Sequence, residues 1–152
     1  MLYLLALLIG IVAGLRAMMA PAAISWAAYL GALDLSGSWL SFLASPWAVG
    51  ILTVLALAEL VTDQLPSTPS RKVPPQFGAR IFTGAVCGAA FGIAGGFWLA
   101  GLVLGMVGAV LGTLGGAAAR HRLAVYFGRD LPAALIEDAV AILGAWAIVW
   151  SL

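Results

Sequence analysis

The chain has 152 residues, of which 64% are hydrophobic and 9% are charged, and its formal net charge at pH 7 is +1. Soluble domains carry about 25% charged residues because their surface faces water, so this composition excludes a water-soluble globule and indicates a chain surrounded by lipid. The near-neutral charge gives no electrostatic basis for binding nucleic acid. The single cysteine, Cys87, excludes a disulfide framework and a thiolate metal site.

Five apolar blocks follow one another along the chain. The first, residues 2–33, is too long for one membrane span of about 20 residues and short for two. We interpret it as a tight helical hairpin that turns near Arg16, and one broken helix is the alternative. The other four blocks are residues 46–63, 79–95, 98–119 and 131–150. No block alternates as a membrane β-barrel would, so the sequence predicts one all-α domain over residues 1–152, a polytopic bundle of five to six short transmembrane helices.

The basic residues between the blocks predict the orientation. Arg71 and Lys72 lie in one loop, and Arg120, Arg122 and Arg129 lie in another. Two crossings separate these loops, so they share a side, which the positive-inside rule makes cytoplasmic. Four tryptophans then fall near the outer interface, where indoles prefer to lie: Trp39, Trp47, Trp98 and Trp150. We expect a multi-pass protein of a bacterial inner membrane, with the lipid bilayer as its main partner.

Glycines recur at four-residue spacing in two blocks: Gly84, Gly88, Gly92 and Gly96, then Gly108, Gly112 and Gly116. This spacing places each row along one helix face and lets two backbones approach closely. We interpret the rows as helix–helix contacts, and a smooth lining for a passage is the alternative.

Two segments 64 residues apart resemble each other. Gly14-Leu15-Arg16 matches Gly78-Ala79-Arg80, and Gly31 matches Gly95. Because two crossings separate the copies, they would form a parallel repeat whose halves are related by an axis along the membrane normal.

Six charged residues lie within the apolar blocks or at their ends: Arg16, Glu59, Asp63, Arg80, Glu137 and Asp138. A charge at the centre of a membrane helix costs roughly 2.5–3.5 kcal/mol on insertion scales, so each needs a partner or water. In the predicted topology all six lie towards the cytoplasmic side, and we predict that they converge as an ion- or ligand-binding cluster. Four acids cannot pair one to one with two arginines, so protonated acids, further bases or a bound cation would complete the cluster. A purely structural ion-pair cluster is the alternative, and the identity of any metal stays open.

The loop over residues 64–75 contains four prolines and cannot continue a helix. Ser70, Arg71 and Lys72 offer donors that could hold a phosphate or a lipid headgroup, although we prefer the interpretation of a rigid connector with cytoplasmic charges. The sequence contains no Walker loop, histidine cluster, zinc signature or G-x-S-x-G elbow, so no cofactor is expected.

A family resemblance rests on ELVTDQLP at 59–66, Pro-Ser-Arg at 69–71, Arg80 with Gly84, and the early Gly14 and Arg16. These residues resemble an uncharacterised family of small bacterial integral membrane proteins, known only as a domain of unknown function. That family shows an acid, then Asp-Lys-x-Pro, then an arginine that opens the next helix. This sequence departs at Gln64, where lysine is usual. The resemblance implies the fold and the membrane setting, and it implies no activity.

We therefore predict a small inner-membrane transporter or channel-like protein for a cation or a proton-coupled small polar solute, acting as a homo-oligomer. The acids would coordinate the ion or relay protons, and the arginines would pair with them or hold an anion. One alternative is a structural or assembly protein whose ionic cluster only locks helix packing. The other, less favoured, is a membrane enzyme that acts on lipid phosphate, with acids holding Mg²⁺ through water. A water-filled cavity reaching Glu59 would favour transport, and a dry, fully paired cluster would favour the structural role.

Overall fold

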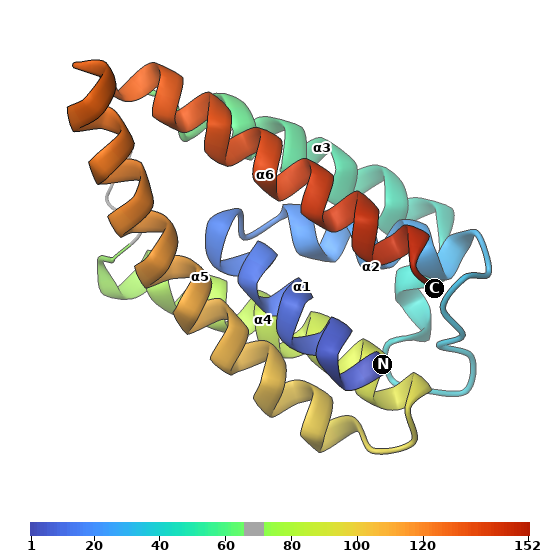
Figure 1. The fold of residues 1–152 in the computed structure, drawn as a ribbon. Coiled ribbons are helices and arrows are strands. Elements are labelled where there is room, and N and C mark those ends of the chain that lie inside the picture. The colour runs from blue at the N-terminus through green and yellow to red at the C-terminus, as the bar shows by residue number, and fades with distance from the viewer. Residues whose placement is uncertain (66–71) are drawn as a thin grey trace.

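The computed structural model describes residues 1–65 and 72–152. Over these residues the structure contains helices and no strand (Figure 1): α1 Leu2–Leu15, α2 Met19–Tyr29, η1 Ser41–Ala44, α3 Pro46–Thr62, α4 Pro74–Ala94, α5 Trp98–Phe127 and α6 Asp130–Trp150. Helices α4, α5 and α6 are long and apolar enough to cross a membrane, and α1 and α3 are apolar but shorter. The predicted all-α class is confirmed, while the number of spans stays a prediction.

The first apolar block forms the predicted hairpin. Helix α1 ends at Leu15, Arg16 takes an extended conformation, and α2 begins at Met19. Figure 1 shows α2 running back towards the end of the molecule where the N-terminus lies. With 14 and 11 residues, α1 and α2 extend about 21 and 17 Å at 1.5 Å per residue. Each is therefore shorter than the roughly 30 Å hydrocarbon core of a bilayer.

Two helix ends differ from the predicted blocks. Helix α4 begins at Pro74 rather than residue 79, because proline fits the first helical positions, where an N–H would have no partner. The apolar block ends at residue 119, whereas α5 continues through Arg120 and Arg122 and stops where Gly128 takes a φ of 74°. Arginine and alanine are good helix formers, so the end of an apolar block is not the end of the helix.

Glycines bring α1, α4 and α5 into backbone contact. A Cβ added to Gly84 would lie 2.7 Å from the carbonyl oxygen of Gly105, and one added to Gly88 would lie 2.7 Å from the Cα of Gly105. The same closeness to a neighbouring backbone is found at Gly10, Gly14, Gly92, Gly108 and Gly112. The interpretation of these rows as helix–helix contacts is confirmed at these positions, whereas Gly96 lies in the α4–α5 turn with a φ of 91°. We call α1, α4 and α5 the glycine core.

Helices α2, α3 and α6 form a looser layer, which we call the outer layer. Figure 1 shows α3 and α6 on one side of α1, with α4 and α5 on the other. Helix α3 buries only Val49 and Ala56, and it packs against α2 and η1. Helix α6 packs on α5, α1 and α2. The two groups of helices are thus held by packing of different tightness.

The segment between α2 and α3 folds over one end of the bundle. Four of its leucines are buried, at positions Leu33, Leu35, Leu40 and Leu43. Trp39 packs edge to face on Trp98 at a ring distance of 6.1 Å, and Tyr3 donates to the Gly95 carbonyl at 3.1 Å. Hydrogen bonds from Ser36 hold the pKa of Asp34, in this segment, below its usual range.

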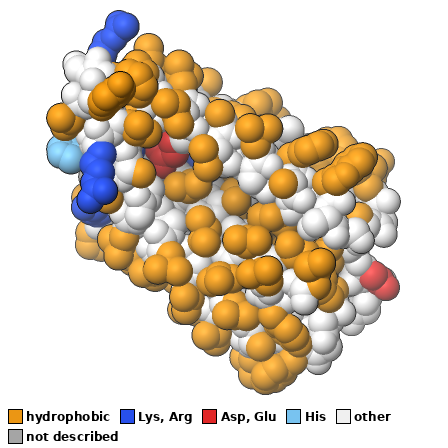
Figure 2. Space-filling view, in the orientation of Figure 1, with side chains coloured by type: hydrophobic (Ala, Val, Ile, Leu, Met, Phe, Trp, Pro, Cys, Tyr) orange, Lys and Arg blue, Asp and Glu red, His pale blue; other side chains and the backbone are white. Residues whose placement is uncertain are grey.

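Charged side chains are gathered away from this segment. Figure 2 shows lysine and arginine side chains and the histidine at one end of the molecule, with a lone acidic side chain near the other. Among the described residues, Asp34 is the charged residue of the α2–α3 segment, and the remaining charges belong to the helix ends and loops near Arg16, Asp63, Lys72 and Asp130. The bundle therefore has a charged end and an aromatic end.

Candidate functional site

Arg16 lies at the tip of the α1–α2 hairpin, and its side chain is fully buried. Its Nε donates to Oδ1 of Asp138 at 2.6 Å, and its Nη2 contacts the same oxygen. Its Nη1 donates to Oδ2 of Asp63 at 2.6 Å, while Oε2 of Glu137 lies 4.0 Å from Nη2. One guanidinium therefore joins the hairpin tip to the end of α3 and to α6.

Glu59 binds the main chain of the hairpin tip. Its two carboxylate oxygens accept from the N–H groups of Ala17 and Met18, each at 2.8 Å. These residues directly precede α2, so the N–H groups would otherwise have no partner within the helix. A carboxylate is favoured at a helix N-terminus, where the helix dipole is positive. Glu59 thus acts as a cap for α2, supplied from α3.

Arg80 binds the carbonyl groups on the other side of the same tip. Its Nη1 donates to the carbonyl oxygens of Gly14 and Leu15, each at 2.8 Å. The hydroxyl group of Thr113 also donates to the carbonyl oxygen of Gly14, at 3.4 Å. Its Nη2 lies 3.8 Å from Oδ2 of Asp63. Buried backbone polar groups need hydrogen-bond partners, so Arg80 and Glu59 together make this interruption of the helix stable.

Arg120 extends the cluster towards the surface. Its Nη2 lies 2.6 Å from Oδ2 of Asp130, and its Nη1 lies 3.4 Å from Oε2 of Glu137. It also approaches the main-chain oxygen of Asp63 at 3.4 Å. The exposed fraction of the side chain falls from 60% at Asp130, through 17% at Arg120 and 14% at Asp63, to zero at Arg16. The ion pairs thus form a continuous chain from the surface to the buried tip.

Gln64 completes the contacts of Asp138, because its Nε2 donates to Oδ2 of that residue at 2.8 Å. We call the assembled residues the charged network: Arg16, Glu59, Asp63, Gln64, Arg80, Arg120, Asp130, Glu137 and Asp138.

The two signs of charge come from different helices. The three arginines follow α1 or lie on α4 and α5, that is, on the glycine core. The five acids lie on α3, directly after it, or on α6, that is, on the outer layer. Every ion pair named above therefore joins the core to the layer.

The six residues predicted to converge do so. Arg120, which the sequence placed in a loop, joins the cluster together with Asp130, so five acids face three arginines, and main-chain N–H groups bind one of those acids, Glu59. Sequence reasoning missed Arg120, Gln64 and Asp130 as members of the network. Ser70 and Arg71 lie outside the described residues, and Lys72 is exposed. In the part of the chain that the structure describes, no group of three or more His, Cys, Asp or Glu residues is arranged to hold a metal ion.

A protein-family model described as "Domain of unknown function (DUF4126)" matches residues 3–150. No curated protein and no solved structure matches the chain. The resemblance to a domain-of-unknown-function family is confirmed, and the match brings no activity, ligand or partner with it.

Proposed function

The chain belongs to the DUF4126 family, and we propose that it is a small transporter or channel-like protein of the bacterial inner membrane, for a cation or a proton-coupled small polar solute. The observation that carries the proposal is the separation of charge between the glycine core and the outer layer. Ion pairs between the tightly packed core and the loosely packed layer can break and re-form. A proton or a cation that neutralises the acids removes the attraction that holds the layer to the core.

The mechanism that we propose is a gate at the charged end. In the closed arrangement Asp63, Glu137 and Asp138 bind the arginines of the core. A cation or a proton that takes the place of these arginines would free the ends of α3 and α6 to move away. The glycine core would stay fixed, because its backbones are in direct contact. Asp130 and Arg120, at the exposed edge, would be the first residues that the ion meets.

The proposed topology places the charged end in the cytoplasm and both termini outside. The hairpin would then enter from the outer side and turn at membrane depth, as broken helices do at the binding sites of many transporters. The parallel repeat fits this arrangement, because the two matched arginines, Arg16 and Arg80, both face Oδ2 of Asp63, at 2.6 and 3.8 Å. Homo-oligomerisation remains a prediction.

Flux into liposomes tests this function. The purified protein would be reconstituted into liposomes with entrapped dyes that report H⁺, Na⁺, K⁺ or Mg²⁺, and a gradient of each ion would be imposed in turn. We expect flux of at least one ion, a loss of about tenfold or more in Glu137→Gln, and no change in Asp34→Asn at the aromatic end. Wild-type liposomes that stay as tight as empty ones to every ion would contradict the proposal.

A second candidate is the structural or assembly role, which three observations favour. Arg16 is fully buried between Asp63 and Asp138, and Glu59 is bound by main-chain N–H groups. The cavity between α2, α3 and α6 is lined by apolar residues and by none of the network acids. If Glu137→Gln lowers the unfolding temperature, and liposomes with the wild-type protein show no ion flux, the network serves only to hold the helices together. The lipid-phosphate enzyme remains a prediction that no contact described above favours.

A further inference from the structure

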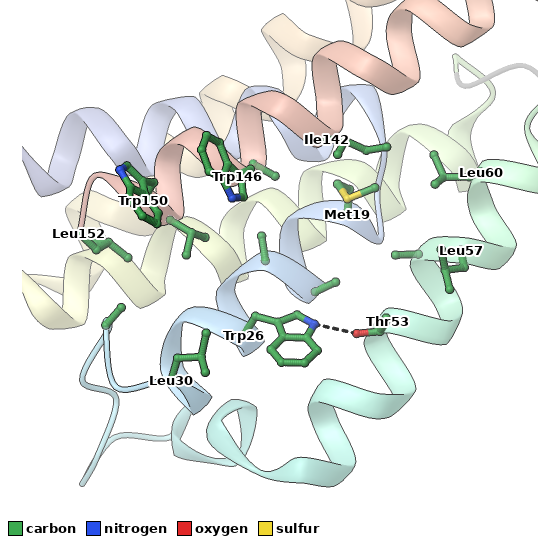
Figure 3. Close-up of a pocket in the computed structure, with 16 residues that line it drawn as sticks. Met19, Trp26, Leu30, Thr53, Leu57, Leu60, Ile142, Trp146, Trp150 and Leu152 are labelled. Atoms are coloured by element: carbon green, nitrogen blue, oxygen red, sulfur yellow. Dashed lines mark hydrogen bonds between the residues drawn. The ribbon is translucent and has the colours of Figure 1, made fainter.

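An apolar groove of about 780 Å³ lies between α3 and α6, with α2 as its floor. Figure 3 shows Leu57 and Leu60 reaching into it from α3, and Ile142 and Trp146 from α6. Small side chains leave the space open, namely Ala22, Ala23, Ala56 and Ala145. The groove is where the inner face of α3 lacks a partner, since this helix buries only Val49 and Ala56.

The lining selects an apolar occupant. Two of its polar groups bind each other, because Nε1 of Trp26 donates to Oγ1 of Thr53 at 2.9 Å (Figure 3). The other lining side chains are aliphatic, thioether or indole groups. A ligand that carried unpaired polar groups into this groove would lose their hydration without compensation.

The dimensions distinguish a lipid chain from a protein helix. From Ile142 to Trp150 the groove follows α6 for about 12 Å, close to the roughly 15 Å that one leaflet contributes to the hydrocarbon core. A helix with side chains is about 10–12 Å wide and would need roughly 900–1,400 Å³ over that length. The groove volume of about 780 Å³ is smaller than this, so a helix from a second copy would lie only partly inside it, whereas the narrower acyl chain would lie within it.

The position of the groove assigns the leaflet. Ile142 lies one helical turn beyond Asp138 of the charged network, and the groove continues from there to Trp150 and Leu30 at the aromatic end. We propose that the groove holds one acyl chain of a bilayer phospholipid, in the leaflet away from the charged network. This chain supplies the contacts that α3 lacks and so completes the packing of the outer layer. The inference requires that the protein lies in a bilayer and does not depend on transport.

Native mass spectrometry of the detergent-purified protein tests the site. We expect about one phospholipid per chain to survive gel filtration in the wild type. Ala23→Phe fills the floor of the groove and should remove that lipid. Its control, Ala100→Phe, changes a half-buried alanine on α5, away from the groove, and should keep the lipid. Because Ala23→Phe could fail to fold, Leu57→Ala gives a second test: it truncates a wall residue that is 58% exposed, and should lower the retained lipid severalfold.

A second measurement separates a bound chain from loosely associated lipid. Removing lipid with excess detergent should lower the unfolding temperature of the wild type by several degrees, and adding dioleoylphosphatidylglycerol should restore it. A wild type without stoichiometric phospholipid, or an Ala23→Phe variant that retains as much as Ala100→Phe, would overturn the proposal. A dimer that Ala23→Phe dissociates would overturn it in favour of a second copy.

Discussion

Arg16 and Asp138, 122 positions apart in the sequence, meet through two guanidinium nitrogens on one carboxylate oxygen. The contact joins the hairpin tip at the start of the chain to the last helix. Because Arg16 is fully buried, its loss would leave Asp63 and Asp138 without their main cation.

Replacing Arg16 by alanine should destabilise the fold by about 3–5 kcal/mol, the usual cost of removing one partner from a buried ion pair. Arg16→Lys should also be unstable, since one ammonium group cannot reproduce the fork that reaches both acids. Thermal unfolding in detergent measures both. The control is Arg122→Ala on the exposed part of α5. Equal unfolding temperatures for Arg16→Ala and Arg122→Ala would show that the ion pairs of Arg16 contribute nothing to the stability of the fold.

Glu59→Gln should loosen the start of α2. The amide retains one acceptor oxygen, so one of the two N–H groups at Ala17 and Met18 loses its partner, at a cost of about 1–3 kcal/mol. Hydrogen exchange should become faster at these two amides and stay unchanged in α5. Asp130→Asn, at a side chain that is 60% exposed, serves as the control. Unchanged exchange in Glu59→Gln would mean that Glu59 does not cap the helix.

Gly88→Leu should prevent close packing of α4 on α5, because any side chain there meets the backbone of Gly101 and Gly105. Gly78→Leu is a matched control on the same helix, since a Cβ at Gly78 has nothing within 4 Å. Gel filtration should show aggregation of the first variant and a normal peak for the second. Equal behaviour of the two would contradict the glycine contact.

Gln64→Lys should be tolerated or stabilising, since an ammonium group could donate to Oδ2 of Asp138 as the amide does. Gln64→Leu should be destabilising, because it removes that donor from a mostly buried carboxylate. We expect the lysine variant to unfold at a temperature at least as high as the wild type, and the leucine variant to unfold at a lower temperature. A leucine variant as stable as the wild type would show that Asp138 has no need of this contact.

Cysteine labelling tests the orientation. With Cys87 replaced by serine, cysteines at Ser36 and at His121, both exposed, should react with a membrane-impermeant maleimide from opposite sides of the membrane. Ser36 should react from the periplasm and His121 only after the cells are opened. Labelling of both residues in intact cells would reverse or refute the proposed topology.

The convergence of the network could be predicted from sequence because lipid makes a solitary charge costly, so Arg16, Arg80 and the acids had to meet one another or water. The role of Glu59 could not, since its partners are main-chain N–H groups that exist only where the hairpin interrupts the helix. Arg120 was assigned to a loop because the apolar block ends before it, whereas α5 continues and turns its side chain towards Glu137.

The distance along the chain between Arg16 and Asp138 has a consequence for biosynthesis. At about 5–20 residues per second, a ribosome adds Asp138 roughly 6–24 s after Arg16, so the arginine is made well before its main partner. Asp63 is added roughly 2–9 s after Arg16 at the same rates, and it binds the same guanidinium. Asp63 would therefore neutralise the nascent hairpin first, and the arrival of α6 would be the step that completes the bundle.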